Sequence, residues 1–245
     1  MKQAICAVAL ACAATMVGHA SRITPVPRAA QNAPADALGR LESTLEAHPD
    51  DLRAGNDYRM AVIQGGQYDR AIAFFQKLVT ANPTAANAHL NYGFAYVDKI
   101  PVAGAITQVI LANNALGEFT KSIEIRPTWI ALYTRGNSYL FWPRIFNRTQ
   151  LGIDDLLAAL KMQKEGPKQP YYVRVYVALG DGYWKLDEFA QAANTWRDGL
   201  VQFPDNPVLK ARLAAQGDGM KALMDAAYDP AARVNTSLQD LWANQ

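Results

Sequence analysis

The sequence predicts an all-α protein, built as a solenoid of stacked helical hairpins. The stretch from Tyr176 to Pro207, YVALGDGYWKLDEFAQAANTWRDGLVQFPDNP, has helical spacing on both sides of a short turn and ends at proline. Related units recur along the chain, and Pro49 and Pro83, which each close one, lie 34 residues apart. A single hairpin cannot bury its apolar face alone, so the copies must stack on one another.

The first twenty residues, MKQAICAVALACAATMVGHA, have the layout of a secretory signal peptide cut after Ala20. Lys2 gives a positive start, the next stretch carries no charge, and Gly18 and Ala20 are the small residues before the cut. The apolar run is shorter than the roughly 20 residues that a membrane-spanning helix needs. Lipoprotein processing before Cys12 is the alternative, although VALA is a poor lipoprotein box.

Residues 21–36, SRITPVPRAAQNAPAD, contain three prolines without apolar periodicity and predict a flexible spacer. Both cysteines precede Ala20, so the processed chain would be held together by packing rather than by disulfides. It would keep 23 basic and 22 acidic residues, which predicts no general attraction to nucleic acid or to an anionic membrane. We expect an exported bacterial protein, periplasmic or secreted.

The repeated unit has a defined spacing of small, aromatic and proline residues. Counting back from Pro204, the marked positions are Trp196, Ala192, Tyr183, Leu179-Gly180 and Tyr176. The same offsets return with Ala71 and Phe75 before Pro83, with Tyr92-Gly93 and Tyr96, and with Ala115 and Phe119 before Pro127. This spacing resembles the tetratricopeptide repeat (TPR), and the resemblance implies a right-handed superhelix of helix–turn–helix units.

The predicted array covers residues 37–229. An unpaired second helix over 37–49 precedes repeats over 52–85, 86–128, 129–170 and 173–206. The third repeat is weak because LGIDDLLAALKMQKEG lacks a clear alanine–aromatic pair. Residues 207–229 predict a capping helix with an interruption at GDG. Residues 230–245 predict a C-terminal tail without regular structure, although Leu238, Leu241 and Trp242 are suited to docking on the array.

Two insertions interrupt the repeat phase. The first, near 98–114, is apolar and is interpreted either as a longer, packed second helix or as an exposed patch for a partner or lipid. The second, FWPRIFNRTQ over 141–150, places Phe141, Trp142 and Phe146 beside Arg144. These side chains either fill the local core or form a binding patch, since Trp and Arg are enriched at binding hot spots.

The sequence lacks motifs for catalysis, cofactors or metals. After Ala20 the only histidines are His48 and His89, and no cysteine remains. The two histidines lie too far apart in sequence to match the spacing of metal ligands. Phosphate-binding loops and nucleophile motifs are missing as well. We therefore expect no enzyme, no cofactor and no metal, with an enzyme of unrecognised site as a remote alternative.

The resemblance implies a binding groove along the concave face, lined by the first helix of each repeat. Helical phase assigns the outward positions, which are rich in aromatic, aliphatic and asparagine side chains. They are Asn56, Met60 and Ile63, then Asn87, Leu90, Asn91, Phe94 and Val97, then Tyr133, Asn137 and Leu140, and finally Arg174, Val177, Asp181 and Trp184. A carboxylate clamp of the kind known in the family is not expected, because only Arg174 and Arg53 offer positive charge.

The expected function is that of a non-catalytic scaffold that binds a protein or an extended peptide in this groove and serves an envelope complex. The alternative is a carrier of a small apolar ligand or lipid, held by the apolar insertion near 100–111.

Overall fold

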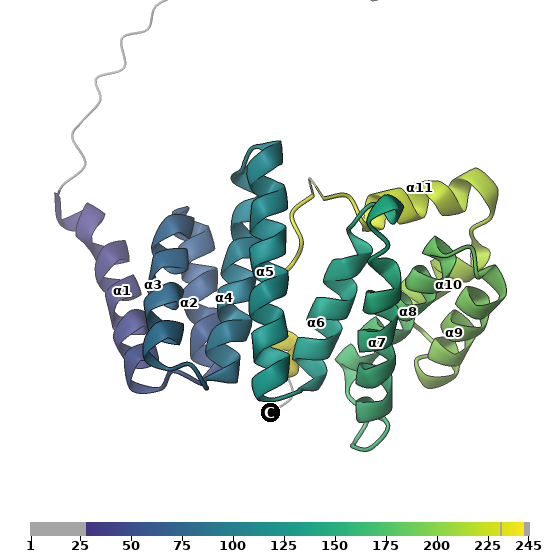
Figure 1. Cartoon of the computed structure of the whole chain (residues 1–245), viewed down its shortest axis with the longest axis horizontal. Helices are drawn as coiled ribbons and strands as arrows, with labels where there is room; N and C mark the ends of the chain where they lie inside the picture. The colour runs from purple at the N-terminus through teal and green to yellow at the C-terminus, as the bar shows by residue number, and fades with distance from the viewer. Residues whose placement is uncertain (1–27, 231, 243–245) are drawn as a thin grey trace, which may run out of the picture.

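The computed structural model describes residues 28–230 and 232–242. Within these ranges the regular structure is helical, and the helices stand side by side in a curved row (Figure 1). The predicted signal peptide at 1–20 lies outside the described residues. Helix α1 (Arg28–Ala47) begins inside the segment predicted as a spacer, so helix replaces spacer from Arg28 onward.

Four antiparallel hairpins follow α1, each made of an inner and an outer helix. They are α2 (Leu52–Gly65) with α3 (Tyr68–Ala81), α4 (Ala86–Lys99) with α5 (Ala105–Ile125), α6 (Trp129–Leu140) with α7 (Thr149–Gln163), and α8 (Val173–Lys185) with α9 (Phe189–Gln202). Short 3-10 turns, η1 (Ile100–Val102), η2 (Arg144–Phe146) and η3 (Pro170–Tyr172), lie in the connections. The predicted all-α solenoid is confirmed.

Local signals set the helix ends. Asp51 caps α2 by accepting a hydrogen bond from the Ala54 amide at 2.9 Å, and Gly66 ends it in the left-handed conformation at φ 64°. Asn206 caps α10 (Pro207–Ala214), where Pro207 occupies the first turn and needs no amide partner. Proline and cap residues therefore mark the boundaries that the 34-residue spacing predicts.

The small residues of the repeat lie where helices cross most closely. A β-carbon on Gly93 would lie 2.3 Å from the Phe119 ring, and one on Gly180 would lie 2.2 Å from the Trp196 indole nitrogen. In the third repeat the crossing is made by Gly136 and Gly152, whose β-carbon would lie 2.6 Å from the Gly136 carbonyl. A pair of glycines thus replaces the missing alanine–aromatic pair, because backbones without side chains approach directly.

The first insertion lengthens the second helix of repeat two. Helix α5 has 21 residues, and its first turns extend beyond the neighbouring helices with Ile106 82% and Ile110 53% exposed. Both interpretations therefore hold in part, since the insertion is helical and its apolar side chains are open to solvent.

Two short helices close the array, and the chain breaks between them at residues 215–216, directly before GDG. Helix α10 is followed by α11 (Gly217–Ala227), which runs crosswise to the repeat helices (Figure 1). Their apolar residues Leu209, Met220 and Met224 are buried with Ala192 and Trp196 of the last repeat. The last repeat is therefore capped, as a solenoid end requires.

Candidate functional site: a tail-filled groove and an adjoining cavity

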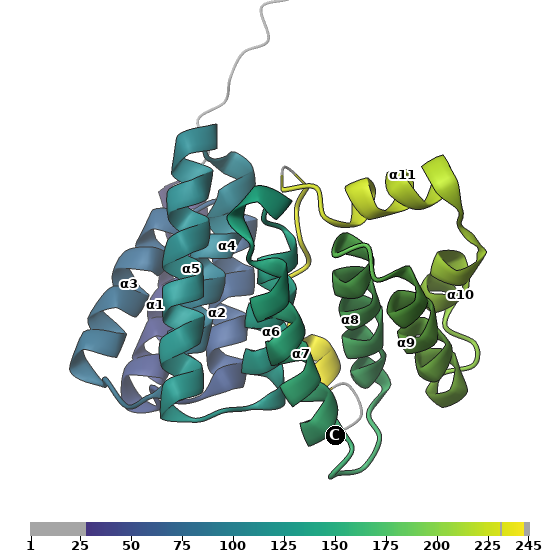
Figure 2. The same ribbon diagram turned by 45° about the vertical axis from the view of Figure 1, so that its right-hand side comes forward.

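The packing of the inner helices along the concave face is interrupted in the middle of the array. The inner helices α2 and α4 pack together, as do α6 and α8, but α4 and α6 make little direct contact. After α11 the chain returns to this place, and the yellow C-terminal segment lies between the two halves (Figures 1 and 2). We call residues 232–242 the tail; it ends in the 3-10 turn η4 (Gln239–Leu241).

A buried polar strip on α2 and α4 holds the tail by its main chain. The strip consists of Asn56, Arg59, Asn91 and Asp98, all at most 5% exposed. The side-chain oxygen of Asn56 accepts from the Leu238 amide at 2.9 Å, and the Arg59 guanidinium donates to the Thr236 carbonyl at 3.0 Å. The tail thus has both an amide and a carbonyl bonded, two residues apart.

The strip is organised by its own internal bonds. Arg59 also donates to Asn91 and to Asp98, each at 3.0 Å, and its guanidinium lies 4.5 Å from the centre of the Phe94 ring. Burial raises the pKa of the Asp98 carboxyl, while Arg59 and the Thr236 hydroxyl act in the opposite direction. A buried ion pair of this kind is costly to break from either side.

Apolar side chains anchor the rest of the tail. Leu238 is 3% exposed and lies in the cluster that contains Leu90, Phe94 and Trp129, with Leu241 and Trp242 at its edge. The Arg53 guanidinium lies 5.7 Å from the Trp242 ring, and Asp240 forms an ion pair with Arg174 from the other half of the array. The tail therefore bridges the two halves.

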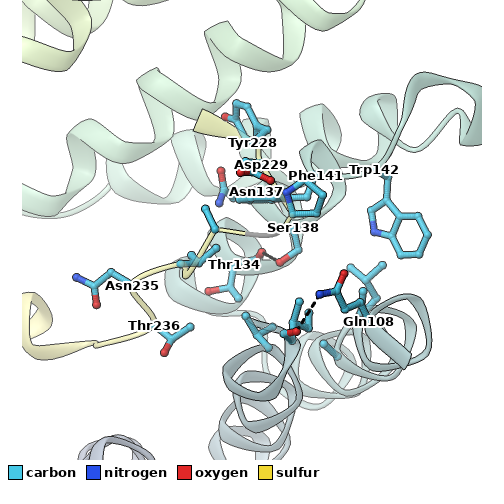
Figure 3. Close-up of a pocket in the computed structure, with 18 of the residues that line it drawn as sticks. Gln108, Thr134, Asn137, Ser138, Phe141, Trp142, Tyr228, Asp229, Asn235 and Thr236 are labelled. Atoms are coloured by element: carbon cyan, nitrogen blue, oxygen red, sulfur yellow. Dashed lines mark hydrogen bonds between the residues drawn. The ribbon is translucent and has the colours of Figure 1, made fainter. Parts of the chain in front are cut away.

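Beside the tail lies a cavity of about 1280 Å³, which we call the insertion cavity (Figure 3). Phe94 and Phe119 form one wall, the insertion residues Phe141, Trp142 and Phe146 another, and tail residues 234–238 a third. Its charged lining residues are Arg174 and Lys185 against Asp225 and Asp229, so neither sign of charge predominates. The volume exceeds the usual range of about 300–1,000 Å³ for small-molecule pockets.

Polar groups at the rim of the cavity come from several elements. Asn137, Thr134 and Ser138 of α6 lie along one side, and Gln108 donates to the carbonyl oxygens of Ile100 and Ala103 in the first insertion (Figure 3). Lys185 donates to the carbonyls of Leu140 and Trp142, which fixes the start of the second insertion, and burial lowers the pKa of Lys185. These groups orient the loops around an apolar interior.

Part of the predicted groove and part of the predicted insertion patch meet in this cavity. Six groove residues line it together with three aromatic residues of the patch. They are Phe94, Val97, Tyr133, Asn137, Arg174 and Trp184 from the groove, and Phe141, Trp142 and Phe146 from the patch. The fourth patch residue, Arg144, instead forms an exposed ion pair with Asp187 at 2.5 Å.

Several predicted groove residues are not open to a partner. The tail covers Asn56 and Leu90, and Phe94 is only 7% exposed. Asn91 is buried against α2, where it bonds Arg59 and the Leu52 carbonyl. Asp181 is fully buried because Arg212 of α10 binds it at 2.5 and 2.6 Å and Tyr228 donates to it at 2.9 Å. The helical phase placed these residues outward, but a neighbouring helix or segments from the C-terminal end cover them.

Of the other groove residues, Leu140 is fully buried in the core, and three have contacts elsewhere. Asn87 bonds Asp50 through its amide at 2.7 Å and its side chain at 2.8 Å, which ties α4 to the preceding turn. Val177 packs at the edge of the cluster formed by the last repeat and the cap. Met60 is half-buried on α2. Met60 and Val177 contribute to neither the polar strip nor the cavity, and Asn87 meets the strip only through its carbonyl, which accepts from the Asn91 side chain at 3.1 Å.

The prediction missed Arg59, Asp98 and Thr236, which make the strip's central contacts. A usable signal was present for two of them, because Arg59 follows Asn56 by three residues and Asp98 follows Phe94 by four. Those separations put each on the same helix face as a predicted groove residue. No signal in the sequence pointed to Thr236.

The described ranges contain no group of three or more His, Cys, Asp or Glu side chains able to hold a metal ion. Over these same residues, no helix combines the length and apolar character needed to cross a bilayer.

The sequence profile described as "Tetratricopeptide repeat" matches residues 28–91. A thermophilic TPR protein of Thermus thermophilus aligns in structure with TM-score 0.53 and 19% identity, over 76% of this chain and 91% of that one. PilF of Pseudomonas aeruginosa aligns with TM-score 0.51 and 16% identity, over 85% and 95% of the two chains. YrrB, titled a TPR protein with an unusual peptide-binding site, aligns with TM-score 0.50 and 14% identity, over 82% and 88%. The profile match is confined to residues 28–91, the aligned structures share the fold, and the described part of the chain is an all-α repeat solenoid.

Proposed function

We propose that this protein is a non-catalytic scaffold that binds an extended segment of a partner protein in its concave groove. The observation that carries the proposal is the tail itself, whose main chain is already bonded there by Asn56 and Arg59. Hydrogen bonds to a main-chain amide and carbonyl are available to any peptide, so the groove has the chemistry to hold one. The peptide-binding site named for YrrB agrees with this role.

The test uses the full chain with its tail released. Leu238→Asp places a charge in an apolar cluster and should free the tail without changing the array. Peptides selected from a random library against this variant should bind it, and adding Asn56→Leu should weaken their binding at least tenfold in fluorescence anisotropy. Gln76→Leu, an exposed position on α3, is the matched control.

Failure to enrich any peptide, while the variant stays folded by circular dichroism, would contradict the proposal. Binding that is indifferent to Asn56→Leu would place the peptide site outside the polar strip and would contradict it equally.

We further propose that the protein acts outside the cytoplasm, in the assembly or maintenance of an envelope complex. The signal-peptide layout of residues 1–20 supports export. Intact mass spectrometry of the protein from its native fraction should give a chain that begins at Ser21. A diacylglycerol-modified chain that begins at Cys12 would replace this assignment with a lipid-anchored one.

A second candidate function is the carriage of a small apolar ligand in the insertion cavity. Its specific support is the apolar lining that both insertions build, with Val109, Trp142 and Phe146 among the contributors. Such a site buries apolar area, worth about 25 cal/mol per Å².

Filling the cavity tests the second candidate. Ala112→Phe adds a ring on the lining face of α5, whereas Asn114→Phe adds the same ring on a face that does not line the cavity. Binding of the dye anilinonaphthalene sulfonate should fall at least tenfold for Ala112→Phe and stay unchanged for Asn114→Phe. Equal dye binding by both variants would rule the cavity out as the site.

A further inference from the structure

The tail presents a short pattern of side chains to the groove. The hydroxyl of Thr236 donates to Asp98, and Leu238 two residues later enters the cluster that includes Leu90 and Phe94. Between them Ser237 is only partly buried, and Gln239 after Leu238 is exposed. The groove therefore distinguishes alternate residues from Thr236 to Leu238, where the chain enters the 3-10 turn η4.

The pattern continues toward the C-terminus with one charge and two apolar groups. Asp240 is paired with Arg174, and Leu241 and Trp242 pack at the edge of the cluster containing Leu238. The whole pattern is Thr-x-Leu-x-Asp-Leu-Trp, and each specified position has a matching group on α2, α4, α8 or the cluster between the two halves. A chain segment of different chemistry would leave one of these groups unmatched.

The tail is attached in a way that permits it to leave. The first four residues of the tail, 232–235, are all exposed. The Arg233 guanidinium donates to the Tyr68 hydroxyl at the surface. The strip would keep its internal bonds, because Arg59 stays bonded to Asn91 and Asp98 without the tail. The Asn56 oxygen and one Arg59 nitrogen would then be open to another chain.

We propose that the tail is an internal copy of the partner's binding segment and competes with it for the groove. The partner is a protein with a segment of the form Thr/Ser-x-Leu-x-Asp/Glu-Leu-Trp that takes the same course and turns after the first leucine as η4 does. The tethered tail has a high effective concentration, so a partner displaces it only when its own segment binds tightly or in several copies. This inference rests on the proposed peptide-binding function and adds the identity of the bound sequence.

The test is a fluorescent peptide of residues 232–242 added to the full chain. The Leu238→Asp protein should bind the peptide at least tenfold more tightly than the unchanged protein, because its own tail no longer competes. A peptide with Leu238→Asp should lose binding at least tenfold, and one with Gln239→Ala should keep it. Leu238→Ala in the protein is the milder release variant, should Leu238→Asp impair folding.

The outcomes separate this inference from the proposed function. If the folded release variant binds library-selected peptides through Asn56 but not the tail peptide, the inference is wrong and the scaffold proposal stands. If neither kind of peptide binds, both fail. Equal peptide binding by the released and unchanged proteins would show that the tail does not compete, which also overturns the inference.

Discussion

The polar strip and the insertion cavity adjoin each other on the concave face, yet they use opposite chemistry. The strip is buried, charged and fully hydrogen-bonded, with Arg59 bound to two side chains and to the tail. The cavity is open, apolar in its walls and balanced in charge. Directional bonds select the course of a main chain, whereas an apolar surface accepts any group of fitting shape. The two regions are therefore suited to a peptide and to a bulky apolar group respectively.

The largest expected effect comes from breaking the strip at its centre. Arg59→Met should lower the free energy of unfolding by about 3–5 kcal/mol, because Asp98 would stay buried without its partner. Urea denaturation measures this. Gln64→Met, at an exposed position on the same helix, should change stability by less than about 0.5 kcal/mol. A loss below about 1 kcal/mol for Arg59→Met would mean that the strip is solvated rather than buried.

A smaller effect is expected from the wall of the cavity. Gly93→Ala should cost about 1–3 kcal/mol, because the new methyl group would press on the Phe119 ring that lines the cavity. Gly117→Ala, inside α5 with open space around it, should instead stabilise the protein by roughly 0.5–1 kcal/mol. Thermal melts should show a lower melting temperature for Gly93→Ala and a higher one for Gly117→Ala. Tolerance of Gly93→Ala would show that Phe119 moves freely into the cavity.

Trp184→Ala should have a still smaller effect on stability, about 0.5–1.5 kcal/mol. Its half-buried ring lines the cavity and packs against Phe189 with centroids 6.2 Å apart, so little core packing is lost. The same variant should weaken binding of the dye anilinonaphthalene sulfonate in the insertion cavity at least tenfold, because its ring is part of the lining and about 1.4 kcal/mol corresponds to one decade. A large drop in melting temperature with unchanged binding would assign this ring to the core.

The smallest effect is expected at the rim of the tail. Asp240→Asn removes an ion pair with Arg174 whose carboxylate is 60% exposed, so tail docking should weaken by at most about 1 kcal/mol. Hydrogen exchange of the Leu238 amide reports this docking. The difference in exchange rate of this amide between variant and parent should shrink at high salt, where exposed charges are screened. A salt-independent difference would mean that Asp240 acts through packing instead.

The repeat architecture was predictable because its signals are local. Proline stops, cap residues and the spacing of Ala71 to Phe75 or Ala192 to Trp196 each lie within one hairpin. Repeat three was predicted as weak since its crossing uses Gly136 and Gly152, a pair that a search for alanine followed by an aromatic residue overlooks. Glycine at both contact positions is a signal that a broader search would include.

Only part of the groove was predictable, because whether a groove residue is exposed depends on segments that are distant in sequence and pack over it. Helical phase grouped Phe94, Tyr133, Asn137 and Trp184 on one face, and these four residues line one cavity. It failed for Asp181, which Arg212 covers from 31 residues away, and for Asn56, which the tail covers from 182 residues away. The helical phase of a residue gives the direction in which its side chain leaves its own helix. It contains no information on which other segment of the chain packs over that side chain.

Sequence alone determined the all-helical hairpins, their order and the close crossings at small residues, because each follows from interactions within about one repeat length. Only the tertiary structure decided that α4 and α6 separate, that the insertions and the tail enclose a cavity, and that Arg59 binds Thr236 across 177 residues. Those features arise where the chain folds back on its own array, and the contacts of a returning segment depend on the shape of the whole solenoid.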